Sequence, residues 1–447
     1  MTREVHKLMF VSDAPHLGGA ERYIAAMSGA ARRRGIEPVV CWVRPHDAPA
    51  DVFAGVERDG IAVRVVSAES ARGIAAIRRQ LRDLFCRERP GAAIVNASGR
   101  PRFWLTTWIA RARHVPAAWV HQMVDGCDYR RLPPRRLSGR VEGLHLWRVP
   151  QALRHRLAAA GATAVVTLNE QDRDQVAREH GIRRRRIQVV PHGIDTDRYR
   201  FDAGTRERTR TAWSPLTRDA TLSLLDASRP VACQGSNNRT PAGVTEPFIV
   251  GTAGRLVEGK GVGILIEAVA MLRRRGVSVT VVIAGEGPQR SALGRLAEEL
   301  AVGDAVRFAG FVEDMAGFYC GLDVFALCSR TESFGLVLTE AMACERPVVA
   351  TPTAGARCQI EDGHTGRLLP SFSAAALADG LDELFHRPDY REQLGQRARR
   401  HVLREFSIDG TLERTLQLLS PGRVFGAASD CRRRDTGSTA LAGEGAA

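Results

Sequence analysis

Lysine is almost absent from this sequence. Its 447 residues include 64 Lys and Arg together, and only two of these are lysines, one of them at position 260. Arginine therefore carries nearly all the positive charge, as is typical of a GC-rich genome. Because an ammonium is a compact point charge and a guanidinium a planar fork, a lysine in such a background suggests a fitted site.

Paired cysteines and long apolar runs are also lacking. The nine cysteines form no C-x-x-C pair and no regular spacing, which is typical of small buried side chains in a reducing compartment. No stretch approaches eighteen uninterrupted apolar residues, so we expect no membrane span. The run from Leu8 to Val11 is too short for a signal peptide, and we expect it to be a first β-strand. These absences predict a cytoplasmic protein.

Aromatic residues are scarce, at 6% of the chain. A nucleic-acid-binding surface combines clustered arginines with interleaved aromatics, whereas here the arginines are spread over many helical segments. We therefore expect no nucleic-acid partner. The net charge of +14 leaves two interpretations open: solvated helix faces in an Arg-rich chain, or contacts with phosphorylated small molecules or an anionic membrane.

Short apolar, β-branched runs alternate with longer segments of helical pattern. Such alternation predicts parallel sheets covered by helices on both faces. We therefore expect an α/β protein with two Rossmann-like, doubly wound parallel-sheet domains that face each other across a cleft. The predicted strands are 7–12, 38–43, 62–66, 92–97, 117–122, 163–168 and 187–191, followed by 248–254, 279–285, 305–310, 323–328 and 347–351.

The same pattern divides the chain into four parts. Residues 1–200 form the first domain, and residues 201–247 form a polar linker, punctuated by Pro and Gly, that we expect to be partly disordered. Residues 248–420 form the second domain, closed by helices from about 374 to 419. Residues 421–447 have too little apolar content to pack and are predicted to be a flexible tail.

The loop after strand 248–254 has the composition of an anion-binding site. Ligands of open α/β sheets bind beyond the carboxyl ends of the strands. Here Gly254, Arg255 and Lys260 precede a helical pattern, so close backbone approach, forked hydrogen bonds, a point charge and a helix N-terminus come together. The combination predicts a diphosphate clamp. The alternative is a chance surface lysine beside a glycine-rich turn.

Two further loops support that prediction. Gly285 and Gly287 follow strand 279–285, where small residues let a flat base or ribose lie close. In RTESFGLVLTE, Glu332 lies in a loop and Glu340 in an early turn of a helix, and carboxylates accept hydrogen bonds from sugar hydroxyls. Either carboxylate alone could be a solvated helix charge. Between them, backbone N–H groups can be presented by Ser333, Phe334, Gly335 and Leu336.

These motifs resemble a known family. GRLVEGKG, AGEGP, ESFGLVLTE, and PVVATPTAG followed by DGHTG are similar to the C-terminal half of retaining glycosyltransferases with the GT-B fold, specifically family 4 or "glycosyl transferases group 1". GGAERYI at 18–24 and VVPHGIDTDRY at 189–199 resemble the N-terminal loop and the start of the interdomain linker. The resemblance covers most of residues 5–420.

The resemblance implies a function and a set of site residues. The enzyme would move a hexose from a nucleotide-diphosphate sugar to a hydroxyl of a glycan, lipid-linked or small-molecule acceptor, with retention of anomeric configuration. Arg255 and Lys260 would hold the diphosphate, Glu332 the donor sugar and Glu340 the ribose. The first domain would add the backbone of Gly18 and Gly19 across the cleft and His121 near the transferred sugar, so the implied catalytic residues are His121, Glu332, Arg255 and Lys260.

The resemblance also implies that neither a metal nor another cofactor takes part. Arg255, Lys260 and the helix start at 334–336 would stabilise the leaving diphosphate instead. The D-T-D at 195–197 follows PHGI at the linker, and we expect it to be a turn rather than a metal-binding pair. A glycosidase-like mechanism would need a carboxylic acid and a carboxylate nucleophile on opposite sides of the bond, and we see no such pair in the sequence. The resemblance implies instead that the acceptor attacks from the front face, beside the departing phosphate.

Other readings remain open. The basic segment RRLPPRRLSGR (130–140) is either a solvated loop or a surface for a phosphorylated lipid or the inner face of the cytoplasmic membrane. The same fold could carry a sugar-nucleotide epimerase. A phosphorylase would need a cofactor-bearing lysine in the second domain, where the only lysine, Lys260, is already assigned to the diphosphate clamp, so this alternative is disfavoured. A basic, non-catalytic nucleotide- or nucleic-acid-binding protein is the alternative from another class.

Overall fold

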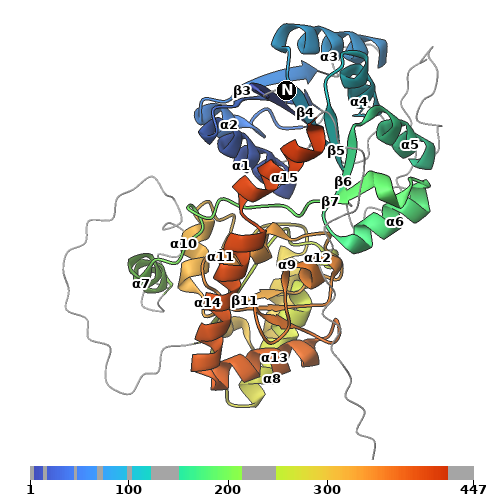
Figure 1. The fold of residues 1–447 in the computed structure, drawn as a ribbon. Coiled ribbons are helices and arrows are strands. Elements are labelled where there is room, and N and C mark those ends of the chain that lie inside the picture. The colour runs from blue at the N-terminus through green and yellow to red at the C-terminus, as the bar shows by residue number, and fades with distance from the viewer. Residues whose placement is uncertain are drawn as a thin grey trace, which may run out of the picture.

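The fold consists of two parallel sheets, each covered by helices, with one domain stacked on the other (Figure 1). The computed structural model describes residues 5–13, 18–44, 48–67, 74–97, 103–121, 151–213 and 248–420. The predicted fold class, two Rossmann-like α/β domains, is confirmed. The expected disorder in the linker beyond residue 213 and in the tail at 421–447 lies outside the described residues.

The first sheet is doubly wound around β1. Its seven strands lie in the order β3-β2-β1-β4-β5-β6-β7, so the chain runs outward from β1 to one edge and returns beside β1 to reach the other. The elements are β1 (Lys7–Ser12), α1 (Gly19–Arg33), β2 (Glu37–Arg44), α2 (Ala54–Arg58), β3 (Ala62–Ser67), α3 (Ile74–Glu88), β4 (Ala92–Ala97), α4 (Phe103–Ala112), β5 (Ala117–His121), α5 (Gln151–Gly161), β6 (Ala164–Thr167), α6 (Glu170–His180), η2 (Arg184–Arg186) and β7 (Ile187–Val189).

Both faces of this sheet are buried, because successive side chains of a strand point to opposite faces. Along β5, Ala118 and Val120 pack into the same apolar cluster as α1. Ala117 and Trp119 pack into the cluster that contains α3, α4 and α5. The strands therefore read as continuous apolar runs, as expected for a parallel sheet with helices on both sides.

The second sheet is wound in the same way around β8. Its order is β10-β9-β8-β11-β12-β13, and every pairing in it is parallel. The two-residue strand β13 was not expected from the sequence. The elements are β8 (Phe248–Ala253), η4 (Glu258–Lys260), α8 (Val262–Arg274), β9 (Val279–Ala284), α9 (Arg290–Glu299), η5 (Gly303–Ala305), β10 (Val306–Gly310), α10 (Met315–Gly321), β11 (Val324–Leu327), α11 (Leu336–Ala343), β12 (Val348–Ala350), α12 (Ala354–Gln359), β13 (Arg367–Leu368), α13 (Ala374–His386), α14 (Pro388–Glu405) and α15 (Ile408–Leu419).

Part of the expected linker is a helix. Residues Ala203–Ala212 form α7, which is capped by Asp202 through a 2.6 Å hydrogen bond from the Thr205 backbone N–H. This helix has no apolar stripe. Arginine side chains, rather than apolar packing, attach it to the second domain. Arg206 donates to the Asp323 carboxylate at 2.7 Å and Arg210 to the Gly321 carbonyl at 3.0 Å. The helix therefore belongs with the second domain.

The chain crosses between the domains twice. The outgoing crossing contains Ile194, whose backbone exchanges hydrogen bonds of 3.0 and 2.9 Å with Phe406 and Ile408 of the returning crossing. The sequence groups α15 with the closing helices of the second domain, whereas in the structure it packs against α1 of the first (Figure 1). The D-T-D segment at 195–197, directly after Ile194, is a turn, as expected. The Asp195 carboxylate accepts hydrogen bonds from the backbone N–H groups of Asp197 and Arg198.

Candidate active site

The order of the second sheet brings the three predicted loops together. β8 lies between β9 and β11, and all three strands are parallel, so their carboxyl ends meet at one edge. The strand order also reverses direction beside β8, which is where ligands of open α/β sheets bind. A pocket opens at this edge. It is lined by Thr252, Ala253, Gly254, Arg255, Leu256, Lys260, Val262, Ile283, Ala284, Leu327, Cys328 and Ser329.

Two of the predicted residues form an ion pair at this pocket. The Lys260 ammonium contacts the Glu332 carboxylate, and the Ser329 hydroxyl lies 3.3 Å from the same carboxylate oxygen. Both charged side chains are partly exposed, at 33% for Lys260 and 17% for Glu332. Arg255 lines the pocket with its side chain exposed. The Lys260 side chain therefore lies at the pocket together with a second cation, Arg255, and the Glu332 carboxylate.

A glycine sets the position of this lysine. Gly261 adopts a left-handed conformation, with φ of 61°, directly before α8, and a Cβ at this position would overlap the Cys328 carbonyl oxygen. Only glycine combines that conformation with so close an approach. The η4 turn that carries Lys260 is thereby pressed against the end of β11, next to Ser329.

Gly285 is required for a reason that the sequence does not reveal. A Cβ there would overlap the Gly254 carbonyl oxygen, and one at Gly287 would meet the backbone of Leu256. The small residues thus allow the loops after β8 and β9 to pack on each other. Whether they also let a base lie close stays a prediction.

The α11 segment places its two carboxylates differently. Gly335, with φ of 79°, precedes the first residue of α11, and Glu332 lies in the loop before it, as predicted. Glu340 is only 3% exposed and accepts a 2.7 Å hydrogen bond from the Tyr319 hydroxyl. Burial, aided by the Glu340 charge, raises the pKa of Tyr319 and of Tyr199, so both phenols remain protonated donors. Glu340 is therefore buried, and its carboxylate is already oriented by a partner.

The first domain meets α11 through its predicted glycine loop. A Cβ on Gly19 would lie in ordinary contact, 3.6 Å from the side chain of Leu336. The backbone N–H of Gly18 donates to the Glu21 carboxylate at 2.7 Å, which fixes the start of α1. Burial raises the pKa of Glu21 to about 7, despite the hydrogen bonds from its own N–H and from Gly18. The loop therefore faces the α11 N-terminus across the domain junction.

Two residues were missed by sequence reasoning, Asn169 at the domain junction and Ser329 in the pocket. The Asn169 amide donates to the Ser333 carbonyl at 2.6 Å, while its side-chain oxygen caps α6 by accepting the Asp172 N–H. Ser329 lies beside Glu332, as described above. Phe334 is buried at the junction, with its ring against His192 and Phe406, so it packs the core. Only the position of Asn169 before a helical pattern could have drawn attention to it.

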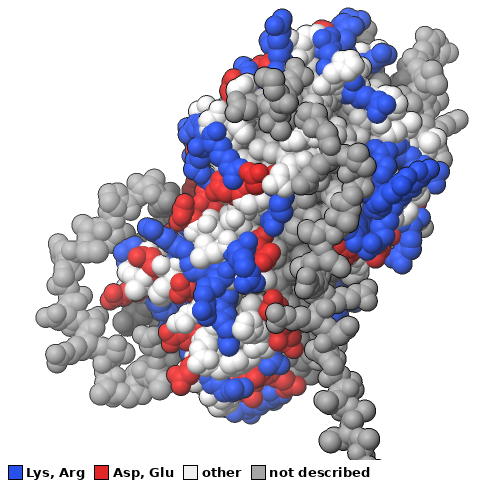
Figure 2. Space-filling model, viewed as in Figure 1, with Lys and Arg blue, Asp and Glu red and all other residues white. Residues whose placement is uncertain are grey.

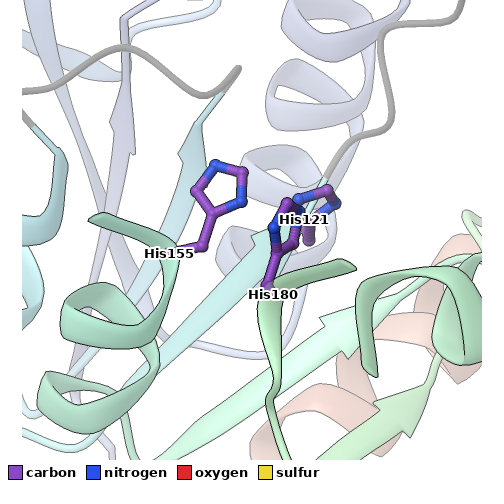
Figure 3. Close-up of side chains that lie close together, drawn as sticks. All are labelled: His121, His155 and His180. Carbon is purple, nitrogen blue, oxygen red and sulfur yellow. The ribbon is translucent and has the colours of Figure 1, made fainter. Parts of the chain in front are cut away.

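His121 occupies a buried cluster rather than the pocket. Its ring points to the face of the sheet opposite α1, where it lies 5.1 Å from the ring of His155 on α5 and 5.6 Å from that of His180 at the end of α6 (Figure 3). Burial lowers the pKa of His121 to about 3 and of His155 to about 2, and it lowers the pKa of His180 as well. Burial therefore favours the neutral form of all three rings. Contact between His121 and a donor sugar stays a prediction.

The basic surface is partly accounted for. On the face shown in Figure 2, Lys and Arg side chains gather on the side of the molecule where Figure 1 shows α5 and α6. Arg183, Arg184 and Arg185, which follow α6 in the chain, are exposed, as expected for surface charge. Arg186 instead donates to the carbonyls of Ala159 and Ala162. The segment 130–140 lies outside the described residues.

Comparison with known proteins identifies the family. The family described as "Glycosyl transferases group 1" matches residues 237–401, and "Glycosyltransferase Family 4" matches residues 17–198. An α-D-kanosaminyltransferase of Streptomyces kanamyceticus is 31% identical over 304 residues, which cover 66% of this chain and 75% of that relative. The chain belongs to the family 4, or group 1, glycosyltransferases. The lipopolysaccharide core biosynthesis glycosyltransferase LpsE of Rhizobium meliloti is 33% identical over 192 residues, which cover 43% of this glycosyltransferase and 54% of LpsE.

Solved structures show the same GT-B fold. Anabaena Alr3699/HepE, crystallised with UDP and also with UDP-glucose, superposes with a TM-score of 0.67 at 19% identity, over 92% of this glycosyltransferase and 99% of that chain. WaaG, a glycosyltransferase of lipopolysaccharide biosynthesis, superposes with a TM-score of 0.59 at 18% identity, over 93% and 100% of the two chains. Within the residues that the structure describes, none of the helices is long and apolar enough to span a membrane.

Proposed function

We propose that this glycosyltransferase takes its sugar from a nucleotide-diphosphate sugar and passes it to an acceptor hydroxyl with retention of anomeric configuration. The observation that carries the proposal is the Lys260–Glu332 pair at the edge of the pocket lined by Gly254 and Arg255. A cation and a carboxylate side by side suit a ligand in which a phosphate adjoins a polyhydroxylated ring.

The diphosphate end of the donor would interact with the basic side of the pocket. Arg255 is exposed and can swing onto a phosphate, while Lys260 exchanges part of its contact with Glu332 for a phosphate oxygen. When the bond from sugar to phosphate breaks, negative charge grows on the diphosphate. Fixed cations in a partly enclosed site stabilise that charge more strongly than water does.

The sugar and the ribose would each interact with one carboxylate. Glu332, released by Lys260, accepts hydrogen bonds from donor sugar hydroxyls, while Ser329 continues to orient it. Glu340 accepts from the ribose, and Tyr319 fixes its orientation beforehand. Retention rests on the family resemblance alone. His121 would have to leave its buried cluster in order to reach the sugar.

A donor panel tests this proposal. We would incubate the purified protein with radiolabelled UDP-, GDP- and ADP-sugars and score release or transfer of the sugar, with the anomeric configuration of the product read by NMR. One nucleotide class should support turnover, and Glu332→Gln should lower kcat/KM for that donor by about 10- to 100-fold, the loss of one or two charged hydrogen bonds.

A matched control lies in the neighbouring loop. Glu258 is exposed at the start of η4, close in sequence to Lys260, and Glu258→Gln should leave donor kinetics unchanged. The proposal fails if no sugar nucleotide is turned over, or if Glu332→Gln and Glu258→Gln behave alike.

A further inference from the structure

We propose that His121, His155 and His180 form a binding site for one divalent transition metal of the zinc class, inside the first domain. This site is separate from the donor pocket, and it does not rest on the proposed function. The three side chains come from three different elements, β5, α5 and α6, and converge beneath the helical layer (Figure 3).

The geometry is close to that of a metal centre. One ring nitrogen of each histidine can be chosen so that the three nitrogens lie within 4.8 Å of one another. Zinc binds imidazole nitrogens at about 2.0–2.1 Å, which sets neighbouring ligand atoms of a tetrahedral site about 3.3 Å apart. Inward shifts on the order of 1 Å would therefore close the three rings around an ion. Such shifts lie within reach of side-chain rotations alone.

Unpaired nitrogens point to a missing partner. His121 and His180 are 6% and 5% exposed, and the Nδ1 atom of each is buried with no hydrogen-bond partner in the described part of the chain. Leaving a buried polar atom unpaired costs on the order of 1–3 kcal/mol. Two such atoms in one cluster would be expensive for a core with no ligand, whereas coordination to a metal would occupy them.

The donor set suits a zinc-class ion. Imidazole coordinates a metal in its neutral form, through a ring nitrogen. Nitrogen ligands favour Zn²⁺, Co²⁺ or Ni²⁺ over Mg²⁺ and Ca²⁺, which prefer oxygen. Three protein ligands leave the fourth tetrahedral position to a water molecule.

One nearby feature works against the ion. The Arg154 charge acts on His155, and the side chain of Arg156, also in α5, reaches the end of α6, where its Nε donates to the His180 carbonyl at 2.7 Å. These guanidinium groups repel a dication and will weaken its binding. The hydrogen bond nevertheless holds the end of α6 against α5, which places His180 beside His155, with ring centroids 4.0 Å apart.

The site would act as a structural clasp. His180 ends α6, and the other end of that helix, capped by Asn169, meets the second domain at Ser333. The intervening helix has 11 residues and is therefore about 17 Å long at 1.5 Å per residue. A metal at the cluster would thus tie β5, α5 and α6 together at a distance from the donor pocket, and its effect should be on the stability of the first domain.

Metal titration tests the proposal directly. The full chain, prepared without a polyhistidine tag and dialysed against chelator, is titrated with Co²⁺ alone. We expect one equivalent to bind with the visible absorption bands of a tetrahedral ion, and Zn²⁺ to displace it and raise the Tm. X-ray absorption of the zinc form should show three imidazole nitrogens at about 2.0 Å.

Substitutions locate the site. His155→Asn and His180→Asn should each weaken Co²⁺ binding by at least tenfold, the loss seen even for outer-shell partners of a metal. His364→Gln, an exposed histidine outside the cluster, should change nothing. The proposal is overturned if the native chain binds no Co²⁺ or if both cluster variants bind it as the native chain does. It is also overturned if the X-ray absorption spectrum of the zinc form shows no imidazole ligands. The last measurement needs no variant, so a misfolded substitution cannot leave the question open.

Discussion

The strand ends of the two domains differ in what they gather. In the second domain, the loops after β8 and β11 bring Lys260, Ser329 and Glu332 together at a partly exposed pocket. In the first domain, the end of β5 turns His121 inward, where it meets two other neutral histidines. Both sheets are parallel and wound alike, so the difference comes from the side chains and not from the topology.

The difference shows what identical folds leave undetermined. A doubly wound sheet fixes where loops converge, but the alternation of side chains along a strand decides whether its last residue faces a cleft or a helical layer. Val120 packs with the α1 layer, so His121 must face the opposite one. Charged groups at strand ends bind ligands only when this parity favours them.

The two lysines test the comparison most strongly. Lys260→Ala should lower kcat/KM for the donor by about 100-fold or more, because it removes the cation that we propose stabilises the leaving diphosphate. Lys7 is the first residue of β1 in the first domain, and its ammonium lies 2.8 Å from Glu37 and 3.2 Å from Glu88. Lys7→Ala should cost about 1 kcal/mol of stability and leave donor kinetics unchanged. Steady-state kinetics and urea unfolding of both variants check this.

A conservative replacement sharpens the same test. Lys260→Arg keeps the charge but changes its shape, and we expect partial loss, between the native protein and Lys260→Ala. Full activity with arginine would mean that charge alone matters at this position. Unchanged turnover in Lys260→Ala would remove the basis for the diphosphate clamp.

Glu21 offers a pH test of the first domain. Because burial raises its pKa to about 7, from an ordinary value of 4.5, the folded state holds a proton that the unfolded state has lost between these values. Its contribution is therefore complete below about pH 4.5 and declines as the pH rises to 7, by about 2–3 kcal/mol. Glu21→Gln should show a shallower loss of unfolding free energy from pH 4.5 to 7.5. Equal pH slopes in the two proteins would refute the assignment.

Asn169 should give the smallest effect. Asn169→Asp retains the side-chain oxygen that caps α6 but loses the amide donor to the Ser333 carbonyl. Unfolding of the first domain should change little, while KM for the donor rises about fivefold, as expected for one lost hydrogen bond of about 1 kcal/mol at the domain junction. Asn169→Ala removes both interactions and should also lower stability. A KM unaffected in both variants would show that this contact plays no part in donor binding.

Most of the fold follows from local pattern. Every strand of four or more apolar residues was predicted, because a buried parallel strand must be apolar on both faces. β13 escaped because two residues carry no pattern. α7 escaped because arginines attach it to Asp323. Burial alone would raise the pKa of Asp323, but this pKa lies below its ordinary value because of Arg210, the Ile249 N–H and Arg206. Helices fixed by charge leave no apolar periodicity to detect.

The site was predictable in part. Lys260 and Glu332, 72 positions apart, were expected in one site because both follow predicted parallel strands, and ligands of open α/β sheets bind beyond the carboxyl ends of the strands. The order of the second sheet, with β8 beside β11, is what brings their loops together. The burial of Glu340 under Tyr319 was not expected, since a partner 21 residues away in α10 leaves no mark on the local sequence. The histidine cluster was missed for a similar reason. Its members have no regular spacing, and packing alone brings them together.

The return of α15 to the first domain makes the chain's end part of its beginning. Tyr23 and Ile24 of α1 share an apolar cluster with Ile408 and Leu412 of α15, and Arg34 reaches Glu413 at 2.5 Å. A chimera that exchanges the second domain for that of a relative must therefore keep residues 408–419 together with the first domain. A hybrid cut only in the linker after β7 would carry the relative's α15 against the α1 surface of this chain. The mismatched apolar surfaces would be exposed, and we expect the hybrid to aggregate.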